Sequence, residues 1–167
     1  MRHVWIVLVA ALWGCAAPTG VSSTEPGDSF VGKYDTFFDP TDHGEIPTDG
    51  SDIAWVSAGE QFHTWTFTLT GPSTMTITTN RPDGEPGLDT TLYLHRFDSV
   101  TGLWGRSIAR NDNREDSLWW SGLEEDLDEG AYQVKVKAAL EGDTGAFVLD
   151  LSCTGDGCTP TAEPSAQ

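Results

Sequence analysis

A nine-residue stretch near the middle of the chain, Ala109 to Ser117, carries a dense set of side chains capable of chemistry. Its sequence, ARNDNREDS, contains three carboxylates, two carboxamides and two arginines. Such side chains serve as catalytic acids and bases, as an oxygen cage for a metal ion, or as a polar turn between strands. The rest of the sequence has to separate these three interpretations.

Catalytic signatures do not accompany this stretch. The sequence has no G-x-S-x-G, no H-E-x-x-H and no phosphate-binding glycine pattern. Asp143-Thr144-Gly145 has the letters of an aspartic-protease triplet, but it follows Leu-Glu-Gly and leads into a predicted strand, as a hairpin turn does. The histidines lack the spacing of metal ligands. We therefore predict a protein that is not an enzyme and has no catalytic residues.

Calcium is the metal that fits the oxygen-rich stretch. It takes about six to eight oxygen ligands, which carboxylates, carboxamides and backbone carbonyls supply. In a β-sandwich a neighbouring loop can add ligands, and Asp89, at the start of a predicted strand, is the best placed. The candidate calcium ligands are Asp89, Asn111, Asp112, Asn113 and Asp116.

A polar turn is the competing interpretation of the same residues. Asn and Asp favour turns because their side chains bond to nearby backbone groups and tolerate left-handed conformations. Arg110 and Arg114 are placed to pair with the acids, and exposed pairs of this kind stabilise little. The sequence leaves calcium site and structural turn both open.

Aromatic side chains suggest a second candidate site. Trp104 lies in a Gly-flanked loop, and Trp119 is one of two adjacent tryptophans that point to opposite sides if extended. Exposed aromatics beside carboxylates can hold sugars or extended peptides. The alternative is that these rings fold over the edge of the domain.

The elements that position these residues are short strands. Apolar and polar residues alternate in five runs, at 62–70, 73–79, 90–97, 131–138 and 145–153, separated by Gly, Pro and Asp turns. This pattern predicts an all-β, antiparallel, jelly-roll-like sandwich. Only residues 117–127 offer a candidate helical turn.

The order of the motifs resembles the bacterial pre-peptidase C-terminal domain, a jelly-roll-like β-sandwich appended to exported proteins. The matching residues are Phe67, Asp89-Thr90-Thr91-Leu92-Tyr93-Leu94, Asn111-Asp112-Asn113 and Gly130-Ala131-Tyr132, and the match spans roughly residues 57–153. Asn113 stands where a second aspartate is common. No peptidase domain accompanies the motifs, so the module is expected to stand alone.

The resemblance also implies a source of further calcium ligands. Related collagen-binding modules bind calcium partly through a segment that precedes the sandwich. By analogy, the acidic lead-in of this chain is expected to contribute Asp39, Asp42, Glu45, Asp49 and Asp52.

The N-terminal residues indicate export. A basic start is followed by an apolar run from Val4 to Trp13, which is shorter than a membrane-spanning helix. Leu12-Trp13-Gly14-Cys15 resembles a bacterial lipobox, in which Cys15 is lipidated; an ordinary cleaved signal is the alternative. We predict a protein of the bacterial cell envelope, either an outer-membrane lipoprotein or a secreted protein. Its expected segments are a signal peptide at 1–14, a flexible tether at 15–29, an acidic lead-in at 30–56, the sandwich at 57–153 and a C-terminal tail at 154–167.

Cysteines and charge complete the prediction. Export places Cys153 and Cys158, which flank Thr-Gly-Asp-Gly, in an oxidising compartment where a disulfide is expected. The net charge of −17 argues against nucleic-acid and polybasic membrane roles. The sequence therefore predicts a non-catalytic module for adhesion or recognition, held to the membrane by a lipid on Cys15, with an unknown protein or glycan ligand. An accessory domain serving a secreted protease and a carbohydrate-binding module are the alternatives.

Overall fold

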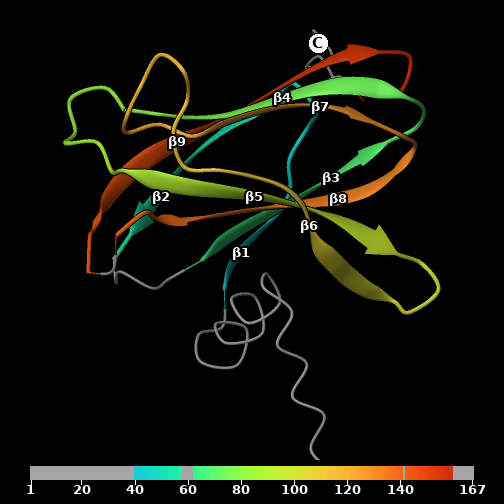
Figure 1. Ribbon diagram of the computed structural model, residues 1–167, viewed down its shortest axis with the longest axis horizontal. Helices are drawn as coiled ribbons and strands as arrows, with labels where there is room; N and C mark the ends of the chain where they lie inside the picture. The colour runs from blue at the N-terminus through green and yellow to red at the C-terminus, as the bar shows by residue number, and fades with distance from the viewer. Residues whose placement is uncertain (1–39, 58–61, 141, 160–167) are drawn as a thin grey trace, which may run out of the picture.

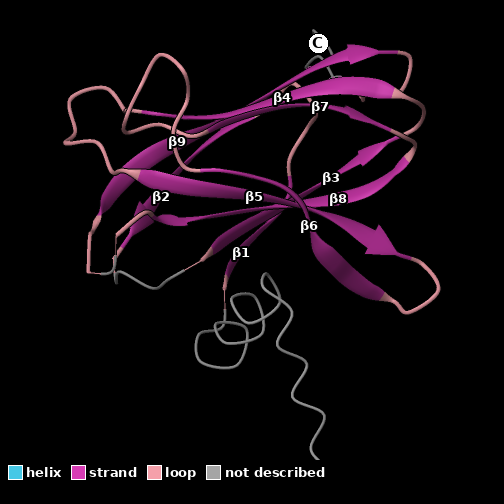
Figure 2. Ribbon diagram, viewed as in Figure 1, coloured by secondary structure: helices cyan, strands magenta, loops and turns pink. Residues whose placement is uncertain are grey.

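The computed structural model describes residues 40–57, 62–140 and 142–159. Within these ranges the chain consists of strands and turns, with no helix (Figure 2). The strands are β1 (Thr41–Glu45), β2 (Ser51–Val56), β3 (His63–Leu69), β4 (Ser73–Asn80), β5 (Thr90–Asp98), β6 (Leu103–Asn111), β7 (Gly122–Leu127), β8 (Gly130–Ala138) and β9 (Gly145–Gly155).

These strands form two sheets that pack face to face (Figure 1). One sheet has the order β1-β3-β8-β5-β6, and the other has the order β2-β9-β4-β7. The predicted all-β sandwich is confirmed. One pairing departs from the antiparallel expectation, because β1 runs parallel to β3.

Alternation along the strands builds the core between the sheets. On β3 the side chains of Trp65, Phe67 and Leu69 are buried, while Thr66 and Thr68 face outward. Met75, Ile77, Leu92, Leu94, Val134, Val136, Phe147, Leu149 and Leu151 fill the same core, as their sequence pattern predicts. Each large apolar side chain contributes roughly 1.5–3 kcal/mol when it leaves water.

The outer face of β5 differs from the expected solvent face. Tyr93 and His95 alternate with the core residues, yet both are buried. The Tyr93 ring lies between Phe62, 6.3 Å away between centroids, and the guanidinium of Arg110, 5.5 Å from the ring centroid. His95 Nδ1 lies 2.9 Å from the carbonyl oxygen of Gly105. Side chains of neighbouring segments therefore cover this face.

The acidic lead-in contains structure that the sequence pattern does not foresee. Strands β1 and β2 lie within residues 30–56, and each joins one sheet of the sandwich. The signal, the tether and the acidic Asp39 lie outside the described residues. Residues 117–127 form bends and β7 instead of a helical turn. Leu123 and Leu127 are an even number of residues apart, so on a strand both point to the buried face, while Glu124 and Asp126 point to the opposite, exposed face.

A disulfide closes the C-terminal end of β9. Cys153 and Cys158 are bonded, with their Cα atoms 5.7 Å apart, which confirms the predicted pair. The turn between them contacts the β3–β4 connection: Gly157 N donates to Ser73 Oγ at 3.0 Å, and Thr70 N donates to Gly157 O at 3.0 Å. In the part of the chain that the structure describes, no helix is long and apolar enough to span a bilayer.

Candidate ligand groove and acidic cluster

Arg114 organises the loop that follows β6. Its backbone N donates to Trp120 O at 2.7 Å, its Nη1 donates to Asn80 Oδ1 at 2.9 Å, and its Nε donates to Asp116 Oδ1 at 3.0 Å. The stem of Arg114 lies on Gly122, where an added Cβ would sit 2.6 Å from Arg114 Cγ. Gly122 is therefore required for this close approach, and the arginine ties the loop to β4 and β7.

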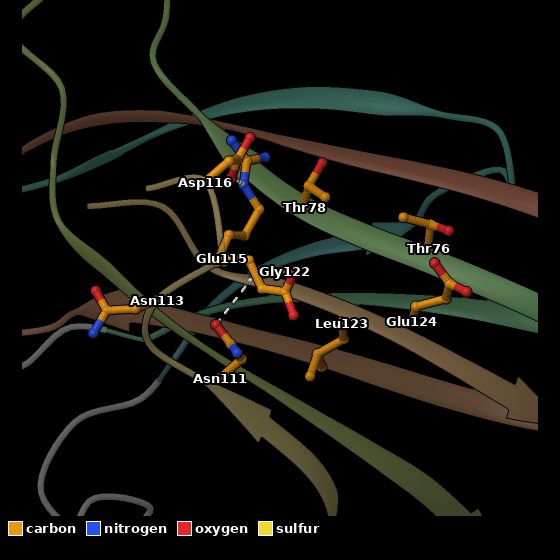
Figure 3. Close-up of a pocket in the computed structure, with 10 residues that line it drawn as sticks. Thr76, Thr78, Asn111, Asn113, Glu115, Asp116, Gly122, Leu123 and Glu124 are labelled. Carbon is orange, nitrogen blue, oxygen red and sulfur yellow. Dashed lines mark hydrogen bonds and ion pairs between the residues drawn. The ribbon is translucent and has the colours of Figure 1, made fainter. Parts of the chain in front are cut away.

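The two asparagines of the loop bond to backbone groups. Asn111 Oδ1 accepts a hydrogen bond from Gly122 N at 3.3 Å (Figure 3). With its amide turned so that the nitrogen faces the two carbonyls, Asn113 donates to Leu118 O at 2.6 Å and to Asp112 O at 3.0 Å. These contacts are those of a structured polar turn, which is one of the two interpretations of ARNDNREDS.

A groove of about 590 Å³ opens between this loop and the outer face of the smaller sheet (Figure 3). Its volume falls in the range of small-molecule sites. The polar groups are three carboxylates, two amides, two hydroxyls and one guanidinium. Its lining consists of Thr76, Thr78, Asn111, Asn113, Arg114, Glu115, Asp116, Gly122, Leu123 and Glu124. Because Arg114 already bonds Asp116, the groove presents an excess of negative charge and hydrogen-bond acceptors.

Sequence patterns identify only part of this groove. The acids of the loop are candidate site residues from the sequence, but Thr76, Thr78 and Glu124 are not. Their positions follow from the pairing of β4 with β7, in which Thr76 lies opposite Glu124. The alternation of β4 predicts outward threonines, and no local pattern shows which strand lies beside them.

Strand register brings two of the predicted calcium ligands to the same end of the sandwich. Leu92 of β5 pairs with Asn111 of β6, so Asp89 before β5 and Asp112 after β6 lie at one edge. The pKa of Asp89 is raised, first by burial and then by the carboxylates of Asp112 and Asp143. Asp89 Oδ1 is buried and has no hydrogen-bond partner. We call Asp89, Asp112 and Asp143 the acidic cluster.

Asp143 is the member of this cluster that the sequence does not predict as a ligand. It lies in the turn before β9, and Gly87 bridges Ala146 just beyond that turn. Asp116 belongs to the groove through its bond with Arg114. Among the described residues, no three His, Cys, Asp or Glu side chains are close enough together to hold a metal ion.

The two candidate tryptophans lie on different elements. Trp104 is in β6 and packs edge-on against Phe97, with 5.2 Å between centroids. Trp119 is in the loop after β6, where its side chain is exposed. Its neighbour Trp120 lies against Gly87, and Leu118 is exposed as well because the segment bends instead of extending. Neither Trp104 nor Trp119 lines the groove.

A histidine pair forms a cluster that sequence spacing does not reveal. His43 Nε2 lies 2.9 Å from His63 Nδ1, and His43 stacks on Trp65 with 4.3 Å between ring centroids. Asp52 Oδ2 accepts from Trp65 Nε1 at 2.8 Å and lies 3.5 Å from His43 Nδ1. We call His43, Asp52, His63 and Trp65 the imidazole cluster. Parallel pairing of β1 with β3 creates it, since Thr41 lies opposite His63.

Comparison with known proteins gives likenesses of structure only. No model of a known family and no curated protein matches the chain. The pre-peptidase C-terminal domain of a collagenase from Bacillus anthracis is 13% identical over 68% of this chain and 95% of its own, with a TM-score of 0.49. PliG of Aeromonas hydrophila, a periplasmic inhibitor of g-type lysozyme, is 16% identical over 70% and 99%, with a TM-score of 0.47. We take no ligand or activity from either protein.

Proposed function

We propose that this chain is an exported, non-catalytic recognition module that binds a glycan in the groove beside β4 and β7. The observation that carries the proposal is the groove itself, a concave site lined by carboxylates, amides and hydroxyls on a hydrogen-bonded loop and on β4 and β7. Such groups form hydrogen bonds with sugar hydroxyls and fix their orientation. The fixed loop lowers the entropy lost on binding.

The charge of the groove selects among glycans. Glu115, Asp116 and Glu124 outnumber the single cation Arg114, whose charge Asp116 already offsets. Anionic sugars are therefore disfavoured, and neutral or amine-bearing sugars are favoured. An amine gains a charge-assisted hydrogen bond to a carboxylate, which is stronger than a neutral one.

Oligosaccharide titration tests this function. The full chain is titrated with neutral cello-oligosaccharides and with amine-bearing, deacetylated chito-oligosaccharides in a calorimeter. We expect Glu124→Gln to weaken binding of the amine-bearing sugar by about ten-fold or more, because a charged hydrogen bond is lost. Glu85→Gln is the matched control, since Glu85 is exposed outside the groove. Failure of both sugars to bind, or equal losses in the two variants, would remove the proposal.

Calcium is proposed as a support for the end of the sandwich that carries the groove loop. The pKa of Asp89 is raised first by burial and then by the carboxylates of Asp112 and Asp143, and a cation bound beside them would favour the ionised form. Thermal unfolding is followed in EDTA and then in excess calcium. We expect calcium to raise the midpoint, and an unchanged midpoint excludes the ion from this role.

Lipidation of Cys15 is proposed as the means of display at the cell envelope. The residues that support it are the apolar run before Cys15 and the tether after it. Metabolic labelling of producing cells with a fatty-acid probe tests it. Label is expected on the wild type and is lost in Cys15→Ser; equal labelling of both chains contradicts the anchor.

A further inference from the structure

A second concave site lies further along the two strands that form the groove. It has a volume of about 330 Å³ and lies beside the start of β4 and the ends of β7 and β9. Thr74, Asp126 and Thr154 are among the residues that line it. We call this site the end pocket. The groove and the end pocket are therefore two hollows on one pair of strands.

Strand register places the groove and the end pocket on one continuous outer face. Thr74 and Thr76 both point outward from β4, because the alternate residues Met75 and Ile77 are buried in the core. Thr76 lines the groove, and Thr74 lines the end pocket. Two residues of a strand span about 6.8 Å. Neighbouring outward positions of one sheet therefore belong to the two sites.

Two successive rows of side chains across this face repeat the same chemistry. Each row carries a hydroxyl on β9, a hydroxyl on β4 and a carboxylate on β7. The groove row is Ser152, Thr76 and Glu124, and the end row is Thr154, Thr74 and Asp126. Figure 3 shows Thr76 and Glu124 of the groove row side by side. A repeated set of donors and acceptors fits a ligand whose own polar groups recur along its length.

The carboxylates of the two rows carry charge that the protein leaves uncompensated. Within the described ranges, neither Glu124 nor Asp126 takes part in an ion pair. Asp126 Oδ1 accepts a hydrogen bond from Thr74 Oγ1 at 2.6 Å, which orients this carboxylate on the sheet. A ligand that brings a cation to each row is therefore favoured.

We propose that the groove and the end pocket form one elongated site for a linear oligosaccharide that carries amines on successive units. This inference rests on the proposed glycan function and adds the length and the repeat of the ligand. The hydroxyls of β4 and β9 bond to sugar hydroxyls, and the carboxylates of β7 form charge-assisted hydrogen bonds with the amines. A single sugar ring occupies one row, and only a chain of several units reaches both. Filling the second row costs no second loss of translational freedom, so affinity rises with chain length.

Calorimetric titration with amine-bearing sugars of two lengths tests the proposal in the full chain. The probes are fully deacetylated chitobiose and chitohexaose, in mildly acidic buffer in which their amines are charged. We expect the hexasaccharide to bind the wild type about ten-fold more tightly than the disaccharide, or more. Equal affinities for the two sugars overturn the elongated site.

Substitutions in the two rows separate this proposal from the glycan function itself. Glu124→Gln is expected to weaken binding of both sugars by about ten-fold or more, whereas Asp126→Asn weakens only the hexasaccharide, by about five-fold. Glu85→Gln is the control for the overall negative charge, because Glu85 is exposed outside both sites. Equal losses of hexasaccharide affinity in Asp126→Asn and Glu85→Gln overturn the elongated site and leave the groove function standing. No loss for either sugar in Glu124→Gln removes the groove function as well.

A neutral sugar and a basic peptide of matching length test the chemistry of the ligand. Cellohexaose is expected to bind about five-fold more weakly than the amine-bearing hexasaccharide, or weaker still, because the charge-assisted hydrogen bonds are lost. Equal affinities of the two hexasaccharides overturn the recognition of amines. Tighter binding of hexalysine assigns the rows to a basic peptide and also overturns the proposal. The melting curve of each variant checks that it is folded.

Discussion

The imidazole cluster and the acidic cluster are built from ionisable side chains at two places in the same sandwich, yet their members contact one another in different ways. In the imidazole cluster each member contacts another: His43 bonds His63, stacks on Trp65 and faces Asp52. In the acidic cluster Asp89 meets two like charges and leaves one buried oxygen without a partner. Each cluster leaves one buried atom without a hydrogen-bond partner, His63 Nε2 in the first and Asp89 Oδ1 in the second, but the first is held by bonds between its members whereas the second brings the carboxylates of Asp112 and Asp143 towards Asp89.

The imidazole cluster has a structural role. Burial and the neighbouring His43 lower the pKa of His63 to about 4, so it stays neutral inside the domain at neutral pH. Its ring bonds His43 of β1 and packs edge-on against Phe147 of β9, so it joins β1 and β3 to the opposite sheet. The acidic cluster lies at the rim, where mutual repulsion costs stability unless an ion binds. Carboxylates gathered at a rim, rather than ionisable groups as such, are the feature on which the calcium proposal rests.

Replacing Trp65 by alanine is the largest expected disruption of the imidazole cluster. The substitution removes a fully buried ring, the surface on which His43 stacks and the donor to Asp52. We expect a loss of about 3–5 kcal/mol in the free energy of unfolding. Urea denaturation measures it, and the exposed Trp119→Ala is expected to change stability by less than about 0.5 kcal/mol. Similar losses in both variants contradict the assignment of Trp65 to the core.

The pH dependence of stability tests whether His63 is buried in its neutral form. The pKa is 6.5 when unfolded and about 4 when folded, so between these values the unfolded chain binds a proton that the folded chain does not. Stability is therefore lost as the pH falls from 6.5 towards 4, by about 3 kcal/mol, and this loss ends below 4. Urea titrations at several pH values measure it. In His63→Gln this part of the slope is expected to vanish, and an unchanged slope contradicts the burial.

Substitution of Asp52 by asparagine has a smaller expected effect, because the amide oxygen still accepts from the Trp65 indole. The variant loses the negative charge that faces His43 Nδ1 at 3.5 Å. We expect a loss of about 1 kcal/mol at neutral pH. A double-mutant cycle with His43→Ala measures the coupling, and a coupling of zero shows that Asp52 acts only through Trp65.

The sequence predicts the central strands because their residues alternate between apolar and polar. The edge strands β1, β2, β6 and β7 escape prediction, and β1, β6 and β7 carry charged residues and glycine, as exposed edges of sheets do. The calcium hypothesis takes Asp89 as a ligand from a neighbouring loop, and the register of β5 with β6 places Asp89 and Asp112 at the same end of the sandwich. Asp143 and the His43–His63 pair could not be predicted, because they depend on contacts between segments far apart in the chain.

Substitution of Asp89 by asparagine has the smallest expected effect and bears on the acidic cluster alone. A raised pKa means that ionised Asp89 is disfavoured in the folded protein, so stability present at low pH is lost as the pH rises through the folded pKa. At neutral pH without calcium, Asp89→Asn is therefore expected to raise the free energy of unfolding by less than about 1 kcal/mol, and the melting midpoint rises slightly with it. The same variant is expected to lose the rise in melting midpoint that calcium gives the wild type, because a charged oxygen is removed.

Asp83→Asn, on an exposed turn, is the control. A variant that is destabilised in EDTA yet still responds fully to calcium would place the ion elsewhere and leave Asp89 a structural residue, as the members of the imidazole cluster are.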